Sequence, residues 1–92
     1  MNVNLKVSKV SCEGRSSKYE SVERSPWDSS KPAVIVYVDQ THSNSLFFNP
    51  YSVVVHTDTR FRRVKKVVTL EAARWVADAA YSEQVRLSDI LS

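Results

Sequence analysis

The chain has 92 residues, of which 42% are hydrophobic and 25% charged, the proportions of an ordinary soluble globular protein. We expect a single compact domain spanning residues 1–92, with a long polar insertion at 13–32. The longest apolar run, residues 33–38, is far shorter than the roughly 20 residues of a membrane span. The alternating N-terminus has no apolar leader segment, and the single cysteine, Cys12, excludes an internal disulfide and suits a reducing, cytoplasmic compartment.

The positive charge is concentrated in one segment. The formal net charge is +3, from 13 Lys and Arg against 10 Asp and Glu. Five of the seven residues from 60 to 66 are cations, and the rest of the chain carries eight cations and ten acids. A local patch of this kind predicts a defined docking surface for an anionic partner. A solvated edge strand protected by its charges would show the same pattern. The candidate binding residues are Arg60, Arg62, Arg63, Lys65 and Lys66.

The first third of the chain predicts one strand and one short helix. Residues Val3 to Cys12 alternate apolar and polar, with Val3, Leu5 and Val7 on one face and a β-bulge near residues 8–9. Within the polar insertion, residues 16–24 fit a short helix, because a structureless loop of that length is unusual. A turn follows, and we expect Trp27 to fold back onto the domain.

Two strands are expected in the middle of the chain. Residues 33–38 are β-branched and aromatic with no polar face, which predicts a central strand. A short apolar cluster, residues 46–48, precedes a second strand at residues 51–56 and a turn at 57–59.

The basic segment from Arg60 to Val68 fits either a strand or a helix. As a strand, one face would carry Arg60, Arg62, Val64, Lys66 and Val68, and the other Phe61, Arg63, Lys65 and Val67. As a helix, Phe61, Val64 and Val68 would form an apolar stripe. The β-branched residues 67–69 favour the strand.

The last quarter predicts a helix over residues 70–81. Thr69 is the expected N-cap, and Leu70, Ala73, Val76, Ala77 and Ala80 form an apolar stripe that Trp75 and Tyr81 broaden. A second short helix begins at Ser82, or the first continues. The fold class is therefore α+β, with a three- to four-stranded antiparallel sheet packed against a C-terminal helix.

Catalytic and metal-binding patterns are missing from the sequence. Cys12 with His42 or His56 is the only thiol–imidazole combination, and these three residues show no metal-ligand spacing. A phosphate-cradling loop needs several glycines, and the chain has one. We therefore expect no enzyme, no metal, no cofactor and no small-molecule substrate.

Binding is the remaining class of function. The basic segment has one aromatic residue and no glycine, so it matches single-strand RNA-reading strands poorly. About three of its cations can face one way, which corresponds to a salt slope of about −2 on a single strand and requires further contacts for tight binding. Additional anchor candidates, each also suited to the core, are Tyr19, Trp27, Phe47 and Phe48.

A small, glycine-poor and cysteine-poor chain without catalytic motifs resembles the phage-encoded anti-CRISPR proteins. In length and character it is similar to inhibitors of type I-F surveillance complexes. The resemblance implies a non-enzymatic inhibitor that binds the complex of Cas subunits and guide RNA in the infected bacterial host and blocks target DNA hybridisation or loading. The basic segment would then contact guide-RNA phosphates. The alternative is a small nucleic-acid-binding regulator that contacts DNA or RNA directly, and a third reading is an accessory structural domain.

Overall fold

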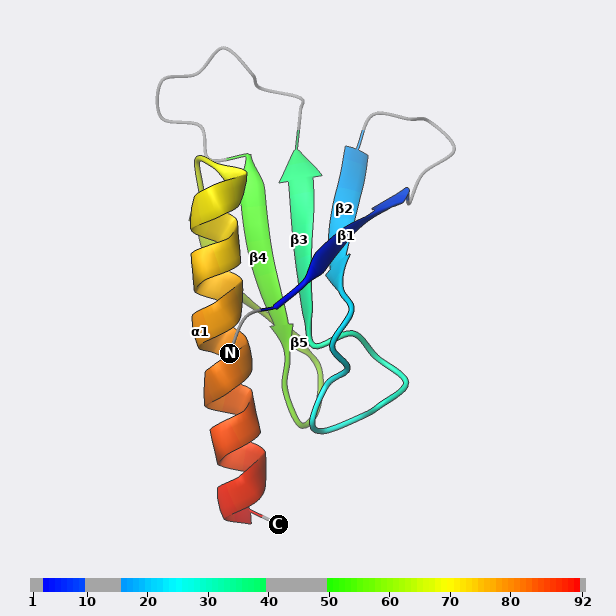
Figure 1. The fold of residues 1–92 in the computed structure, drawn as a ribbon, viewed down its shortest axis with the longest axis vertical. Coiled ribbons are helices and arrows are strands. Elements are labelled where there is room, and N and C mark those ends of the chain that lie inside the picture. The colour runs from blue at the N-terminus through cyan, green and yellow to red at the C-terminus, as the bar shows by residue number, and fades with distance from the viewer. Residues whose placement is uncertain (1–2, 10–15, 40–49, 92) are drawn as a thin grey trace.

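A computed structural model describes residues 3–9, 16–39 and 50–91. Five strands form one antiparallel sheet in which the strand order follows the chain, and one long helix lies against it (Figure 1). The strands and the helix are β1 (Leu5–Lys9), β2 (Ser16–Ser21), β3 (Val34–Asp39), β4 (Tyr51–His56), β5 (Phe61–Val67) and α1 (Leu70–Leu91). The predicted α+β class with a C-terminal helix is confirmed, with one strand more than expected.

The additional strand is β2, where the sequence predicted a helix over residues 16–24. That prediction was wrong because a buried polar residue obscures the alternation of this strand. Ser21 is buried on the core side, where its hydroxyl accepts a hydrogen bond from the Val34 N–H at 3.0 Å and donates to the Glu23 carbonyl at 2.8 Å. Satisfying both groups makes a serine tolerable at a position that an apolar residue normally occupies.

The core lies between the sheet and the helix, which packs against β3, β4 and β5. Val34, Val36 and Val53 are fully buried on the sheet side. The helix contributes Ala73 and Ala77, whose small side chains let its backbone approach the valines closely. The predicted central strand at residues 33–38 is therefore confirmed as β3, the middle strand of the sheet.

The helix begins as predicted and continues without a break to Leu91. Its N-cap is Thr69, whose hydroxyl accepts the Ala72 N–H at 3.1 Å. The expected place of Trp75 in the apolar stripe was wrong, since its side chain is 72% exposed. At 100° per residue, Trp75 lies about 200° from both Ala73 and Ala77, on the solvent side of the helix. The last turns extend beyond the sheet (Figure 1).

The N-terminal strand only partly follows its predicted pattern. Val3 is buried, and its backbone N–H bonds to the Asp78 carboxylate of the helix. Val7, expected on the same apolar face, is 63% exposed because β1 is an edge strand beyond the reach of α1. The β1–β2 register is regular from Leu5 to Lys9, so the expected bulge at residues 8–9 is not formed. Cys12 lies outside the described residues.

The connection between β2 and β3 folds as an ordered loop. Backbone bonds from Ser25 N–H to the Lys31 carbonyl and from Ala33 N–H to the Glu23 carbonyl close its base. At its tip, the Asp28 carboxylate accepts hydrogen bonds from the Ser30 hydroxyl and from the Ser30 backbone N–H. These bonds, the side-chain bond more than the backbone bond, lower the pKa of the Asp28 carboxyl. The order expected within the polar insertion is therefore present, although as strand and loop rather than helix.

The basic segment forms a strand, as the sequence favoured. Its pairing with β4 is not regular, however. Val54 pairs with Arg63 and Val53 with Lys65, which leaves Val64 as an extra residue in a β-bulge. Because of this bulge, the strict alternation predicted for the segment was wrong, and the β5 side chains after Val64 point to the opposite faces of the sheet from those predicted.

His42, one of the two histidines considered with Cys12, and the apolar cluster at residues 46–48 lie outside the described residues. Across the described ranges, α1 is too polar to count as a membrane-spanning helix.

Candidate nucleic-acid interface

The five cations predicted from the sequence are all exposed, but the sheet divides them between its two faces. Directly paired residues of antiparallel strands point to the same face of a sheet. Arg62 pairs with Val55 and Lys65 with Val53, so both point to the side of the core. Arg63 pairs with Val54 and Lys66 with Ser52, on the opposite side. Arg60 lies in the turn before β5.

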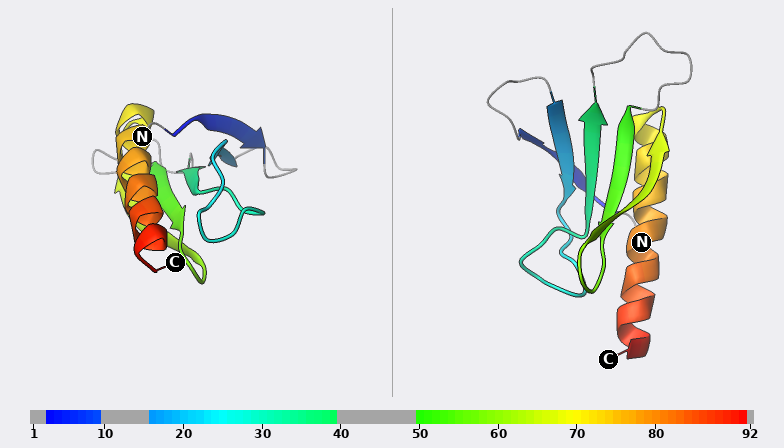
Figure 2. Two further views of the ribbon diagram at one scale, coloured as in Figure 1. Left: turned by 60° about the horizontal axis from the view of Figure 1, so that its bottom comes forward. Right: turned by 180° about the vertical axis from the view of Figure 1, so that it is seen from behind.

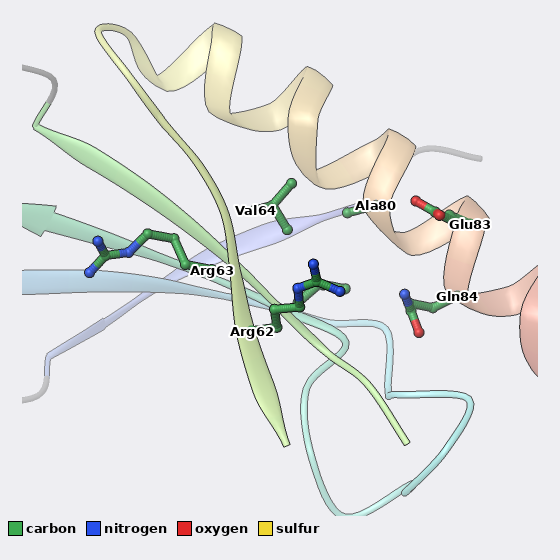
Figure 3. A pocket seen from close by; sticks show the side chains of 7 residues that line it. Arg62, Arg63, Val64, Ala80, Glu83 and Gln84 are labelled. Carbon is green, nitrogen blue, oxygen red and sulfur yellow. The ribbon is translucent and has the colours of Figure 1, made fainter. Parts of the chain in front are cut away.

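Figure 3 shows this division directly. Arg62 and Val64 extend from β5 toward the helix, and Arg63 turns away from it. Arg62 faces a hollow of about 250 Å³ between β5 and α1, whose helix wall includes Ala80, Glu83 and Gln84. The hollow is smaller than the usual range for a small-molecule site, about 300–1,000 Å³. The predicted patch is therefore not one surface.

A different surface gathers cations from three strands, β1, β2 and β5. We call it the open face: the side of the sheet opposite α1, visible in the right panel of Figure 2. The register builds it from two rows of paired residues. One row is Lys18, Tyr37, Ser52 and Lys66, and the next is Lys6, Glu20, Ile35, Val54 and Arg63.

The open face is positively charged. Among its described side chains, four cations stand against a single acid, Glu20. The Lys18 ammonium and the Glu20 carboxylate form an ion pair at 2.9 Å, with both side chains partly buried. Within residues 3–9, 16–39 and 50–91, Arg63 and Lys66 form no ion pair. Their charges are therefore available to an external anion.

One aromatic ring lies open among these charges. Tyr37 is in the central strand, directly between Lys18 of β2 and Ser52 of β4, and is 44% exposed. In the part of the chain that the structure describes, it makes no hydrogen bond or ring contact. The sequence pattern missed it, because Tyr37 was assigned to a strand with two apolar faces and treated as core.

The other aromatic candidates are engaged within the fold. Phe61 meets the His56 ring edge-on, with centroids 4.8 Å apart. Tyr19 packs against the core. Trp27 folds back onto the domain as expected, and its indole N–H donates to the Gln84 amide oxygen at 2.8 Å. Phe47 and Phe48 lie outside the described residues.

A buried serine–histidine pair is structural. The Ser25 hydroxyl and His56 Nδ1 lie 2.7 Å apart in a hydrogen bond, and the Ser25 hydroxyl also accepts the Trp27 backbone N–H. Ser25 and His56 are only 4% and 6% exposed, so the pair is shielded from solvent. The pair fixes the 22–33 loop to the end of β4. No group of three or more potential metal ligands occurs among the described side chains.

The signal that identifies the open face is register, which a single sequence does not show. Lys6 and Lys18 are isolated lysines in the sequence, 42 or more residues before Arg60. Strand pairing brings them onto the surface that carries Arg63 and Lys66. Only the β5 cations were detectable as a cluster, and half of that cluster points elsewhere.

Comparisons of the chain with protein family models, with curated proteins and with solved structures found no match.

Proposed function

We propose that the protein is a non-enzymatic nucleic-acid-binding protein that contacts phosphates through the open face of its sheet. The observation that supports the proposal most directly is the charge of that face: among its described side chains, Lys6, Lys18, Arg63 and Lys66 stand against Glu20, and Arg63 and Lys66 form no ion pair with any described residue. An extended cationic surface spread over several strands matches a chain of phosphates better than it matches a single small anion.

The number of cations sets the expected strength of binding. Lys18 is paired with Glu20, which leaves Lys6, Arg63 and Lys66 for phosphates. Three phosphate contacts on a single strand correspond to a slope of log K against log salt of about −2.1. Binding of this kind depends on counterion release and weakens steeply between low and physiological salt. Affinity from these charges alone falls in the range of sequence-independent binding, a Kd of about 10⁻⁴ to 10⁻⁶ M at physiological salt.

The first prediction concerns the two unpaired cations of the open face. Replacing both Arg63→Gln and Lys66→Gln removes two phosphate contacts, so the salt slope should become shallower by about 1.4 and the affinity should fall about tenfold at low salt. Fluorescence anisotropy of a labelled oligonucleotide, titrated at several salt concentrations, measures both quantities. The melting temperature should be almost unchanged, because exposed charges contribute little to stability.

Two control variants carry the same change in charge on other surfaces. Arg74 and Arg86 are exposed on α1, and Arg62 and Lys65 lie on the core side of β5. The pairs Arg74→Gln with Arg86→Gln and Arg62→Gln with Lys65→Gln should each retain most of the affinity and the slope. Equal losses in all three double variants would show that only net charge matters and would contradict a defined binding face.

The second candidate function is the one implied by the resemblance to anti-CRISPR proteins: inhibition of a guide-RNA–protein complex in the cytoplasm of an infected bacterium. The exposed Trp75 on α1 favours it, because nucleic-acid binding by the open face does not use this side chain. Tryptophan is the residue most enriched among energetic anchors of protein–protein interfaces. The protein would then contact the guide RNA of the complex through its open face and a protein subunit of the complex through α1.

The second prediction separates this candidate from direct nucleic-acid binding. An inhibitor should bind an assembled type I surveillance complex more tightly than its free guide RNA, and Trp75→Ala should weaken the complex at least tenfold, as expected for an anchor. Binding to free RNA should be unaffected by Trp75→Ala. If surface plasmon resonance gives the same affinity for the complex as for the free RNA, the inhibitor hypothesis is contradicted and direct nucleic-acid binding stands.

A further inference from the structure

Tyr37 has a position that the charges of the open face do not explain. It occupies the middle of the central strand, where its neighbours Val36 and Val38 are buried on the core side. Its ring lies on the opposite side, 44% exposed, with no hydrogen bond or ring contact to any other described residue. A planar ring held on a rigid central strand is a preorganised surface for another flat group.

The cations are arranged around this ring. Lys18 is the direct cross-strand neighbour of Tyr37 on one side, and Ser52 followed by Lys66 lies on the other. At about 4.8 Å per strand spacing, Lys18 and Lys66 are about 14 Å apart across the sheet. Arg63 belongs to the adjacent row. A group stacked on Tyr37 would therefore have the unpaired cations Arg63 and Lys66 on its β5 side, and Lys18, paired with Glu20, on its β2 side.

The floor beside the ring is apolar. The two residues of the second row nearest to Tyr37 along the sheet are Ile35, which is buried, and Val54, which is half-buried. An apolar floor with charges at its edges fits a ligand that has flat, weakly polar parts joined by anionic links. That description fits the bases and phosphates of a nucleic acid.

From this arrangement we infer that the ligand is single-stranded, with an unpaired base stacked on Tyr37 and its flanking phosphates on the unpaired cations Arg63 and Lys66. The inference rests on the proposed function and specifies its substrate. In a duplex both faces of each base are already covered by neighbouring bases, so only the phosphates are available to this surface. A single strand offers base faces and phosphates together. Because every base has a π-face, stacking of this type tolerates different sequences.

The test compares Tyr37→Leu with the matched control Tyr37→Phe. Both replacements are apolar and lack the hydroxyl, and only phenylalanine retains an aromatic face. For a labelled single strand of about 12 nucleotides, a length within the range of known single-strand sites, Tyr37→Leu should weaken binding by about 5-fold to 150-fold. Tyr37→Phe should remain within about twofold of the original chain. Oligo-dT and oligo-U serve as the DNA and RNA probes, with the corresponding duplexes at equal phosphate concentration.

Two further readouts distinguish stacking from a change in the fold or in the charges. The salt slope on the single strand should be the same for Tyr37→Leu as for the original chain, since no cation is removed. Affinity for the duplex should also be unchanged. A loss on single strand and duplex alike would assign Tyr37 a structural role and overturn the inference.

The outcome for the proposed function is separate. If the original chain binds single strands with the expected salt slope and Tyr37→Leu binds equally well, the stacking inference fails and phosphate binding stands. If the original chain binds duplexes more tightly than single strands, the stacking inference also fails and phosphate binding stands. If it binds no oligonucleotide at low salt, the proposed function itself is overturned.

Discussion

The contact between Trp27 and Gln84 shows how single side chains hold the loop against the helix. Gln84 is the one polar residue among the buried positions of α1, and its amide oxygen accepts the Trp27 indole N–H at 2.8 Å. Loop and helix are 57 residues apart in the sequence, so this bond closes a large part of the chain. Together with the Ser25–His56 pair, it fixes the loop at the end of the sheet.

A third prediction follows from this contact. Gln84→Leu leaves the indole N–H without its partner and should lower the free energy of unfolding by about 1 kcal/mol, the low end for an unsatisfied donor because Trp27 is half-buried. Trp27→Phe removes the donor as well. The double variant should therefore lose less than the sum of the two single losses in urea denaturation. Strictly additive losses would show that the bond contributes nothing to stability.

The candidate site was only half predicted, for reasons that lie in single residues. The density of charge at residues 60–66 was visible in the sequence, and Arg63 and Lys66 do contribute to the open face. The exposure of Tyr37 was not visible in the sequence, because an aromatic residue in an apolar run indicates burial. Its exposure depends on the helix covering only one side of the sheet, which is a property of the tertiary fold.

At the scale of the element, the N-cap of α1 is the local interaction most open to test. Thr69→Ala removes the acceptor of the Ala72 N–H and should lower stability by about 1 kcal/mol, whereas Thr69→Ser should retain most of it. Thermal unfolding measures both. Binding to oligonucleotides should be the same in the two variants, because the helix lies on the other side of the sheet. An unchanged melting temperature for Thr69→Ala would contradict the capping role.

The elements that the sequence predicted are those with an uninterrupted periodicity. Residues 33–38, 51–56 and 70–81 each show one apolar pattern, and each forms the expected structure. The helix predicted at residues 16–24 was wrong, and the strand predicted for the basic segment was confirmed but without its regular alternation; both differences have identifiable causes. In β2 a hydrogen-bonded serine, Ser21, occupies a core position, and in β5 the extra residue Val64 shifts the alternation by one.

The bulge at Val64 explains why neither predicted face of β5 was apolar. With regular pairing throughout, Val67 and Lys66 would each point to the side opposite to the one observed. The extra residue lets Val67 reach the core and places Lys66 on the open face. Bulges reorient side chains in this way at sheet edges near functional surfaces. The single extra residue Val64 thus determines both that Val67 packs in the core and that the Lys66 charge lies on the open face.

In the whole molecule, the two sides of the sheet differ in what covers them. One side joins the helix to form the core, with Val36, Val53 and Ala77 at its centre. The other side carries Tyr37 and the cations in a layer supported from behind by that packed core. Substitutions on the open face should therefore affect binding with little effect on stability, and the separation makes the two properties independently measurable.

The agreement between strand order and chain order has a consequence for how the molecule folds. Every strand pairs with its neighbour in sequence, so the sheet can assemble one hairpin at a time, with only short-range searches. The bond between Val3 and Asp78 is the opposite case, since it joins groups 75 residues apart. We expect this contact to form late, after the helix has docked, which makes the N-terminal segment the last part of the chain to gain protection from solvent exchange.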